Sequence, residues 1–153
     1  MPSTLFFQYC QKLVIVSADK QSVILAKRKG EADYDGIYSF IGGKMETTDA
    51  TLLAGMQREK NEEIGPQATV RVLPNESYNL YFTKKDGSHV VLSHTAGIFV
   101  GGTIAINDEY SDYIWVPLTK LEAFAPKIDN IPLLTVWALQ KIATASSNQF
   151  VRI

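Results

Sequence analysis

Apolar residues are grouped along the chain in short runs that polar segments separate, a pattern typical of β-strands. The run from Leu13 to Val16 is continuously apolar, which is typical of a strand that is covered on both faces. Apolar and polar residues alternate between Ala68 and Leu73, which indicates another strand. We expect strands over residues 5–18, 22–28, 37–41, 68–73, 78–84, 90–100 and 112–117.

Three segments carry helical patterns. The first begins at Thr48 or Asp49, whose short oxygen-bearing side chains can cap a helix, and it ends at Gly65, just before a proline. Residues 118–124 form a short second helix. Residues 131–145 carry an apolar stripe with the spacing of an amphipathic helix that covers a sheet.

The order of these elements predicts the α/β class. We expect an α/β/α sandwich, in which a central mixed β-sheet carries one long helix on each face. At 153 residues the chain is long enough for a sizeable core, and we expect a single domain over residues 1–153. The pattern leaves open whether residues 146–153 are frayed or docked on the body.

Composition narrows the class of protein. Apolar residues make up 46% of the chain and charged residues 20%, which is ordinary for a globular protein. The net charge of −1 predicts no broad basic surface for nucleic acid, and no apolar run approaches the ~20 residues of a membrane span. The first residues lack the pattern of a signal peptide, and the single cysteine, Cys10, fits a reducing compartment, so we expect a cytoplasmic location. We interpret Cys10 as a buried packing residue rather than a nucleophile. We interpret His89 and His94 as packed or hydrogen-bonded residues rather than substrate contacts.

The segment from residue 42 to residue 66 carries the candidate chemistry. It opens with paired glycines, which we expect to form a turn whose backbone can take positive φ and approach a ligand. Residues three and four apart share a helix face, so Glu59, Glu62 and Glu63 project within an arc of about 100°. Oxygen ligands of this kind suit Mg²⁺ or Mn²⁺. A bare E-x-x-E-E is more often a solvated acidic surface, and the glycine pair favours the metal site here.

This segment resembles the Nudix hydrolase signature, G-x5-E-x7-R-E-U-x-E-E-x-G-U, where U is a bulky aliphatic residue. It also resembles the common lead-in G-x-W-x-F-P-G-G, with Tyr38 where Trp is usual and Ile41 where Pro is usual. So long a combined pattern is far more specific than a lone glycine motif. The matching residues are Gly36, Phe40, Gly42, Gly43, Arg58, Glu59, Glu62, Glu63 and Gly65.

The sequence departs from the signature at three positions. Asp49 stands where the family has a glutamate that supports the arginine, and eight residues rather than seven separate it from Arg58. Lys60 stands at the first aliphatic position, on the expected core face, where it either reaches the edge of that face or pairs with an acid that the sequence does not identify. Pro66 replaces the last aliphatic residue. No metal-ligand position is lost, so an active hydrolase is predicted, and a nucleotide-binding sensor without hydrolysis is the alternative.

The resemblance implies a pyrophosphohydrolase that depends on Mg²⁺ (or Mn²⁺) and acts on phosphoric anhydride bonds. Its substrate would be a nucleoside triphosphate or a nucleoside diphosphate linked to another group. The implied metal ligands are the Gly43 carbonyl, Glu59, Glu62 and Glu63, and Arg58 would orient the glutamates. Because relatives often pair, homodimers are among the arrangements that the resemblance implies.

The general base and the substrate contacts are less specific. Glu59 is one candidate base, and Glu109, in an acidic loop like that of several relatives, is the other, although a loop acid is equally often plain surface. Lys44 could steady a phosphate, Arg28 could meet an anionic group or be ordinary surface charge, and Tyr38 could stack on a base. The choice among an oxidised deoxynucleotide, a dinucleoside polyphosphate, ADP-ribose and a nucleotide sugar stays open.

Overall fold

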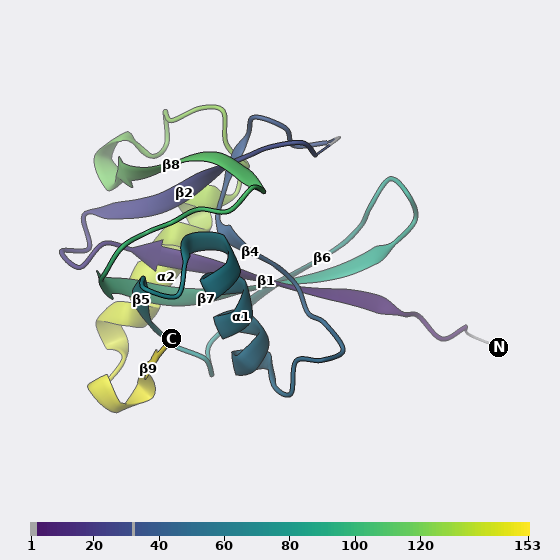
Figure 1. Cartoon of the computed structure of the whole chain (residues 1–153), viewed down its shortest axis with the longest axis horizontal. Coiled ribbons are helices and arrows are strands. Elements are labelled where there is room, and N and C mark those ends of the chain that lie inside the picture. The colour runs from purple at the N-terminus through teal and green to yellow at the C-terminus, as the bar shows by residue number, and fades with distance from the viewer. Residues whose placement is uncertain (1–2, 32) are drawn as a thin grey trace.

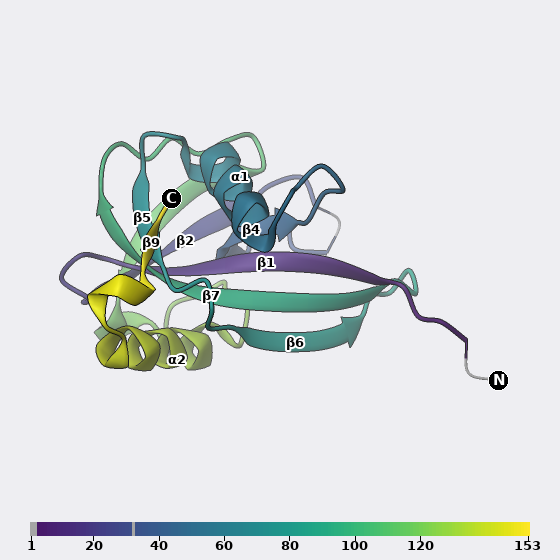
Figure 2. The ribbon, with the colours of Figure 1, turned by 90° about the horizontal axis from the view of Figure 1, so that it is seen from below.

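The computed structural model describes residues 3–31 and 33–153, which form one mixed β-sheet with a helix on each face (Figures 1 and 2). The sheet order is β3-β2-β1-β7-β5-β9, and β4 pairs with β1, β6 with β7, and β8 with β2. The strands are β1 (Phe7–Val16), β2 (Ser22–Arg28), β3 (Tyr38–Ser39), β4 (Ile41–Lys44), β5 (Thr69–Val72), β6 (Tyr78–Thr83), β7 (His89–Gly101), β8 (Tyr110–Pro117) and β9 (Val151–Arg152). The helices are α1 (Leu52–Ile64) and α2 (Ile131–Thr144), with 3₁₀ turns η1 (Leu118–Lys120) and η2 (Ser147–Gln149).

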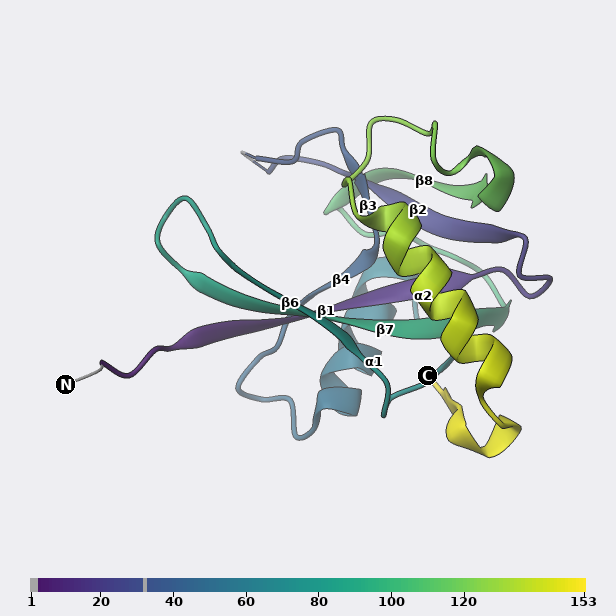
Figure 3. The same ribbon diagram turned by 180° about the vertical axis from the view of Figure 1, so that it is seen from behind.

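The predicted α/β/α sandwich is confirmed. Strands β1 and β7 run parallel, whereas β1 is antiparallel to β2 and β4, so the sheet is mixed. Leu13 and Ile15 pack with α1, while Val14 and Val16 pack with α2. The apolar run in β1 is continuous because both faces of the strand are covered, as Figure 2 shows. Figure 3 shows α2 lying across one face, with the β6–β7 hairpin extending beyond it.

The glycine pair lies in a strand, and the predicted Gly-Gly turn is wrong. Gly42 and Gly43 belong to β4 and pair with Lys12 and Gln11 of β1. Gly42 has a φ of 129°, and a Cβ atom there would lie 2.0 Å from the Gln11 carbonyl oxygen. The close approach of β1 therefore requires glycine at position 42.

Helix α1 begins later than the sequence predicts. Its N-cap is Thr51, whose Oγ1 accepts a hydrogen bond from the Ala54 amide at 3.0 Å. Asp49 does not cap the helix because its carboxylate accepts from the Glu46 amide at 2.8 Å and pairs with Arg58. Gly65 ends the helix with a φ of 93°, as predicted.

The C-terminal half differs from the expectation in three places. The helix expected over residues 118–124 is a 3₁₀ turn over Leu118–Lys120 followed by an irregular turn. Strand β8 begins at Tyr110 because its pairing with β2 extends as far as Arg28. The last residues dock: β9 pairs with β5, and Ile153 is buried.

No helix in the described part of the chain is long and apolar enough to cross a membrane.

Candidate active site

Helix α1 packs directly on β4 where the signature glycine lies. A Cβ atom at Gly43 would lie 2.7 Å and 2.8 Å from the two carboxylate oxygens of Glu59. Position 43 therefore has to lack a side chain for the Glu59 carboxylate to lie against the backbone of β4. This contact brings the predicted ligands Gly43 and Glu59 together.

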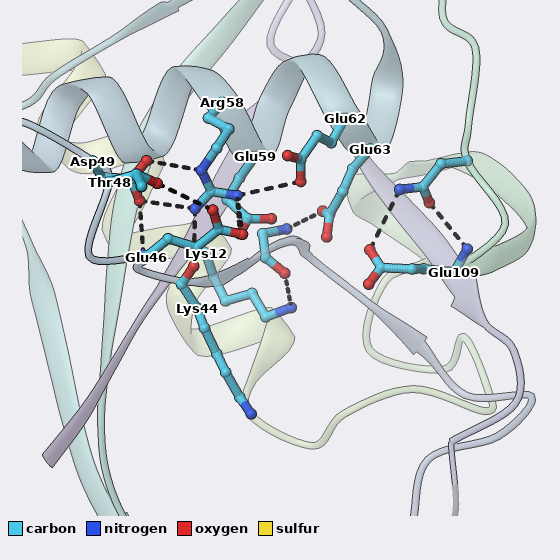
Figure 4. A network of polar contacts seen from close by, with 12 residues as sticks. Lys12, Lys44, Glu46, Thr48, Asp49, Arg58, Glu59, Glu62, Glu63 and Glu109 are labelled. Atoms are coloured by element: carbon cyan, nitrogen blue, oxygen red, sulfur yellow. Dashed lines mark hydrogen bonds and ion pairs between the residues drawn. The ribbon is translucent and has the colours of Figure 1, made fainter.

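Arg58 lies at the centre of a network of acids (Figure 4). Its Nε and Nη2 donate to Asp49 Oδ1 and Oδ2 at 2.8 Å and 2.9 Å, and Nη2 also donates to the Lys44 carbonyl at 3.0 Å. Its Nη1 donates to Glu59 at 3.0 Å and to Glu62 at 3.2 Å. Arg58 thus fixes the orientation of two predicted metal ligands.

Asp49 makes the supporting contact that the family gives to a glutamate. Hydrogen bonds from Arg58, and then from the Glu46 amide, lower the pKa of Asp49 to about 2. The extra residue before Arg58 is accommodated because α1 starts only at Leu52, which leaves residues 49–51 free to follow a non-helical path.

Glu63 is buried between β4 and β8. Its Oε2 accepts hydrogen bonds from the Gly42 amide and, at 3.0 Å, from the Tyr110 hydroxyl. Burial raises the pKa of Glu63 to about 7, and the charge of Lys12 opposes this shift. The Lys12 ammonium donates to the Gly42 carbonyl at 2.7 Å, so Gly42 bridges the Lys12 ammonium and the Glu63 carboxylate.

Glu59 is buried and surrounded by charged side chains. Burial raises the pKa of Glu59, the Arg58 contact opposes the rise, and the charges of Glu62 and Glu109 add to it. Figure 4 shows Glu109 on a separate loop beyond Glu63, where its carboxylate accepts a long 3.4 Å hydrogen bond from Asn107.

The donor set fits a hard divalent cation. The Gly43 carbonyl and three carboxylates supply oxygen, and burial raises the pKa values of Glu59 and Glu63 although Arg58 and Lys12 oppose the rise. Among residues 3–31 and 33–153, no three acidic, histidine or cysteine side chains converge as a ready-made metal site. Glu59 and Glu62 each give one carboxylate oxygen to Arg58, and Glu63 gives one to the Gly42 amide, so these contacts leave the second oxygen of each carboxylate for a cation.

The three predicted substrate contacts lie in different surroundings. Lys44 follows the glycine pair, and Figure 4 shows its ammonium pointing away from the carboxylates. Arg28 pairs with Glu31, with Nε 3.0 Å from Oε2. The Tyr38 hydroxyl donates to Asp112 at 3.3 Å, and its ring packs on Phe124.

Sequence reasoning missed Lys12 and Tyr110. Lys12 carried a usable signal, because a lysine directly precedes the apolar run of β1. Tyr110 carried none, since its partner Glu63 lies 47 residues away in the chain.

Lys60 is buried, and both sequence alternatives for it are wrong. The residue is 2% exposed, and its Nζ donates to the Ala68 carbonyl at 2.7 Å and, weakly, to the Gly65 carbonyl at 3.4 Å. Carbonyl groups at and beyond a helix C-terminus lack donors within the helix, and the Lys60 ammonium supplies a hydrogen-bond donor there. Burial lowers the pKa of Lys60.

Comparison with known proteins agrees with this geometry. The family pattern described as "NUDIX domain" matches residues 12–134. The chain belongs to the Nudix family. Nudix enzymes typically depend on divalent metal ions. A comparison with curated protein sequences finds no match.

Solved structures share the fold of this chain over 90% or more of its length. A MutT protein from Methanosarcina mazei Go1 is 17% identical, with a TM-score of 0.70 over 92% of this chain and 99% of its own. The NUDIX domain of Shewanella oneidensis NrtR, complexed with ADP ribose, is 18% identical, with a TM-score of 0.70 over 91% of this chain and 90% of its own. A C. elegans Ap4A hydrolase in a binary complex is 14% identical, with a TM-score of 0.70 over 90% of this chain and 99% of its own. At these identities the likeness establishes the fold alone.

Proposed function

We propose that this Nudix protein is a pyrophosphohydrolase that depends on Mg²⁺ or Mn²⁺. It cleaves a phosphoric anhydride bond in a nucleoside triphosphate or in a nucleoside diphosphate linked to another group. The observation that carries the proposal is the Arg58 network, in which Asp49 fixes the guanidinium and the guanidinium orients Glu59 and Glu62.

Four groups would hold the cation: the Gly43 carbonyl and the carboxylates of Glu59, Glu62 and Glu63. When bound, a divalent cation neutralises phosphate charge and lowers the pKa of water. Glu62 is the most accessible of the three carboxylates, with a side chain that is 52% exposed, and only one of its oxygens contacts Arg58.

The residues around these ligands supply positioning and proton transfer. Arg58 keeps Glu59 against β4, and the Lys44 ammonium steadies a phosphate of the substrate. Glu59 or Glu109 accepts the proton of the attacking water. Glu59 lies among the proposed ligands and is held by Arg58, whereas Glu109, on a loop of its own, does not have to serve as a ligand at the same time.

The nucleotide class of substrate is supported by the relatives. The NrtR domain is complexed with ADP ribose, and the C. elegans relative is an Ap4A hydrolase. We place the organic part of the substrate near Tyr38 and an anionic group near Arg28, which would first have to release Glu31. We further take residues 1–153 to be one domain in the cytoplasm that does not use nucleic acid or membranes as partners, and a homodimer is compatible with it.

A sensor that binds nucleotide without cleaving it is the competing function. Its sequence support was the substitution at position 60 and the shifted acid at position 49. In the structure, Lys60 bonds the end of α1, and Asp49 makes the arginine contact. Neither departure disturbs the carboxylates, so hydrolysis is the function that the geometry favours.

The test is a panel of nucleotides incubated with Mg²⁺ or Mn²⁺, with products separated by ion-exchange chromatography. The panel contains nucleoside triphosphates, an oxidised deoxynucleotide, a dinucleoside polyphosphate, ADP-ribose and a nucleotide sugar. Glu62→Gln removes one exposed ligand and should abolish turnover, whereas Glu122→Gln makes the same change at an exposed position outside the site and should not. Full activity of Glu62→Gln would contradict the proposal, and metal-dependent binding without turnover would favour the sensor.

A further inference from the structure

A second group of charged residues lies outside the signature. It surrounds a hollow of about 430 Å³ where β5, β9, the end of β7 and the β1–β2 turn meet. In Figures 1 and 2 these elements lie at the end of the sheet opposite the tip of the β6–β7 hairpin. We call it the basic hollow, and its lining includes Lys20, Arg71, Arg152, Ile98, Phe99 and Val100.

The sheet register gathers positive charge in the basic hollow. Ile98 of β7 pairs with Arg71 of β5, which in turn pairs with Arg152 of β9. Neighbouring strands are about 4.8 Å apart, so the two arginine side chains leave adjacent strands on the same face. Like charges directly opposite one another destabilise a sheet, which favours an anion between them.

The described chain does not supply that anion from a side chain. The described lining residues include no carboxylate side chain. Nor does any ion pair found within residues 3–31 and 33–153 involve Lys20, Arg71 or Arg152. Asp19, beside Lys20, accepts hydrogen bonds from Ser17 and the Gln21 amide within its own turn.

Arg71 is already oriented. Its guanidinium lies 4.6 Å from the centre of the Phe150 ring, and its Nη2 is 3.5 Å from the Ser147 carbonyl. A stacked guanidinium keeps its edge free for paired hydrogen bonds to phosphate oxygens and loses little further entropy on binding. Val100, which is 42% exposed, adds an apolar surface next to this charge.

We propose that the basic hollow binds the phosphoryl group of a small organic phosphate, at a site separate from the α1 carboxylates. Two guanidinium groups and an ammonium match the several oxygens and multiple charge of a phosphate or diphosphate better than the two oxygens of a carboxylate. Ile98 and Val100 provide contact for the organic part. No residue of the hollow belongs to α1 or β4, so the inference goes beyond the proposed hydrolase and does not depend on it.

Isothermal titration of the full chain with inorganic pyrophosphate, in EDTA and at low salt, tests the phosphoryl subsite. We expect binding to the wild-type protein and about tenfold or greater weakening in Arg152→Gln, because a charge-assisted hydrogen bond is lost. Arg71→Gln/Arg152→Gln should remove detectable binding. The matched control, Lys85→Gln/Lys120→Gln, removes two exposed positive charges elsewhere and should bind with wild-type affinity.

Three results would overturn the inference. They are an absence of binding by the wild-type protein, equal weakening in the lysine control, or loss of binding in Lys44→Gln with retention in Arg152→Gln. If Arg71→Gln unfolds because it loses the Phe150 contact, Arg152→Gln still decides, since Arg152 is exposed. The titration contains neither a divalent metal nor a nucleotide substrate, so a failure of the proposed hydrolase leaves its result interpretable.

Discussion

Asp49 accepts two hydrogen bonds from the Arg58 guanidinium, with Oδ1 2.8 Å from Nε and Oδ2 2.9 Å from Nη2. Asp49 precedes the N-cap Thr51, whereas Arg58 lies in the middle of α1, so the two hydrogen bonds connect the loop before the helix to the helix itself. The same guanidinium contacts Glu59 and Glu62. The orientation of the candidate metal ligands therefore depends on a residue that need not touch the metal itself.

The first prediction is that Asp49→Ala weakens Mn²⁺ binding and turnover by about 10- to 100-fold, as expected when a partner behind a metal ligand is lost. Asp49→Asn, which keeps one acceptor oxygen for the guanidinium, should lose less. Mn²⁺ affinity can be measured by electron paramagnetic resonance, independently of turnover. Thr48→Ala, an exposed change next to Asp49, is the control, and a loss as large as that of Asp49→Ala would show that the effect belongs to the loop in general.

The second prediction contrasts the two glycines of β4. A Cβ atom at Gly43 would meet the end of the Glu59 side chain at 2.7 Å, whereas one at Gly42 would meet the Gln11 backbone oxygen at 2.0 Å. Gly43→Ala should therefore fold, displace Glu59 and lose metal affinity. Gly42→Ala should lose stability, on the order of 3 kcal/mol or more, because backbone has to move and φ is positive.

Thermal unfolding and Mn²⁺ titration of both variants separate these effects. Gly55→Ala is not a suitable control, because its Cβ atom would lie 2.4 Å from the Met45 sulfur. Gly87→Ala is a better control for positive φ, since nothing lies within 4 Å of its added Cβ atom. If Gly43→Ala binds Mn²⁺ as tightly as the wild type, then Glu59 does not need its position against β4.

Much of this architecture follows from local pattern, and the places where prediction failed share a cause. The apolar run of β1 predicted a strand covered on both faces, and the apolar stripe of α2 predicted a helix that covers one of them. Both predictions succeed because the spacing of apolar residues along an element reports which of its sides are buried. Gly42 was placed in a turn, although it lies in β4, because the strand that crowds it is about thirty residues away. The spacing of the signature predicted which carboxylates gather on α1, but it does not predict the contacts of Lys12 and Tyr110, because these residues come from the strands β1 and β8.

The third prediction concerns Lys60, which donates to the buried Ala68 carbonyl at 2.7 Å. Lys60→Met keeps the apolar stem and leaves that carbonyl without its donor. We expect a loss of about 1–3 kcal/mol in the free energy of unfolding, the usual cost of an unsatisfied buried group. Urea unfolding measures it, with the exposed Lys120→Met as control. A more stable Lys60→Met would mean that burying the ammonium costs more than its hydrogen bonds return.

The last prediction is a pH dependence of stability that His94 causes. His94 is 2% exposed, and its Nδ1 lies 3.1 Å from the Tyr78 carbonyl, which identifies Nδ1 as the protonated nitrogen. Burial lowers its pKa to about 4, the Tyr78 hydrogen bond opposes the shift, and the nearby charge of Lys12 adds to it. The folded protein therefore keeps His94 neutral at pH values where the unfolded chain, with a histidine pKa near 6.5, binds a proton.

The sign follows from this difference in proton binding. Above about pH 6.5 the imidazole is neutral in both states, so its contribution to stability is fully present. As the pH falls from 6.5 to 4, the unfolded state takes up a proton that the folded state does not, and stability falls by about 3 kcal/mol. His94→Gln can still donate to Tyr78 but does not titrate. The free energy of unfolding of both proteins is measured with urea at each pH. In the difference between the two proteins, the contribution of the acidic groups that both contain cancels. A difference that stays constant from pH 7 to pH 4 would show that His94 takes up its proton equally in the folded and unfolded states.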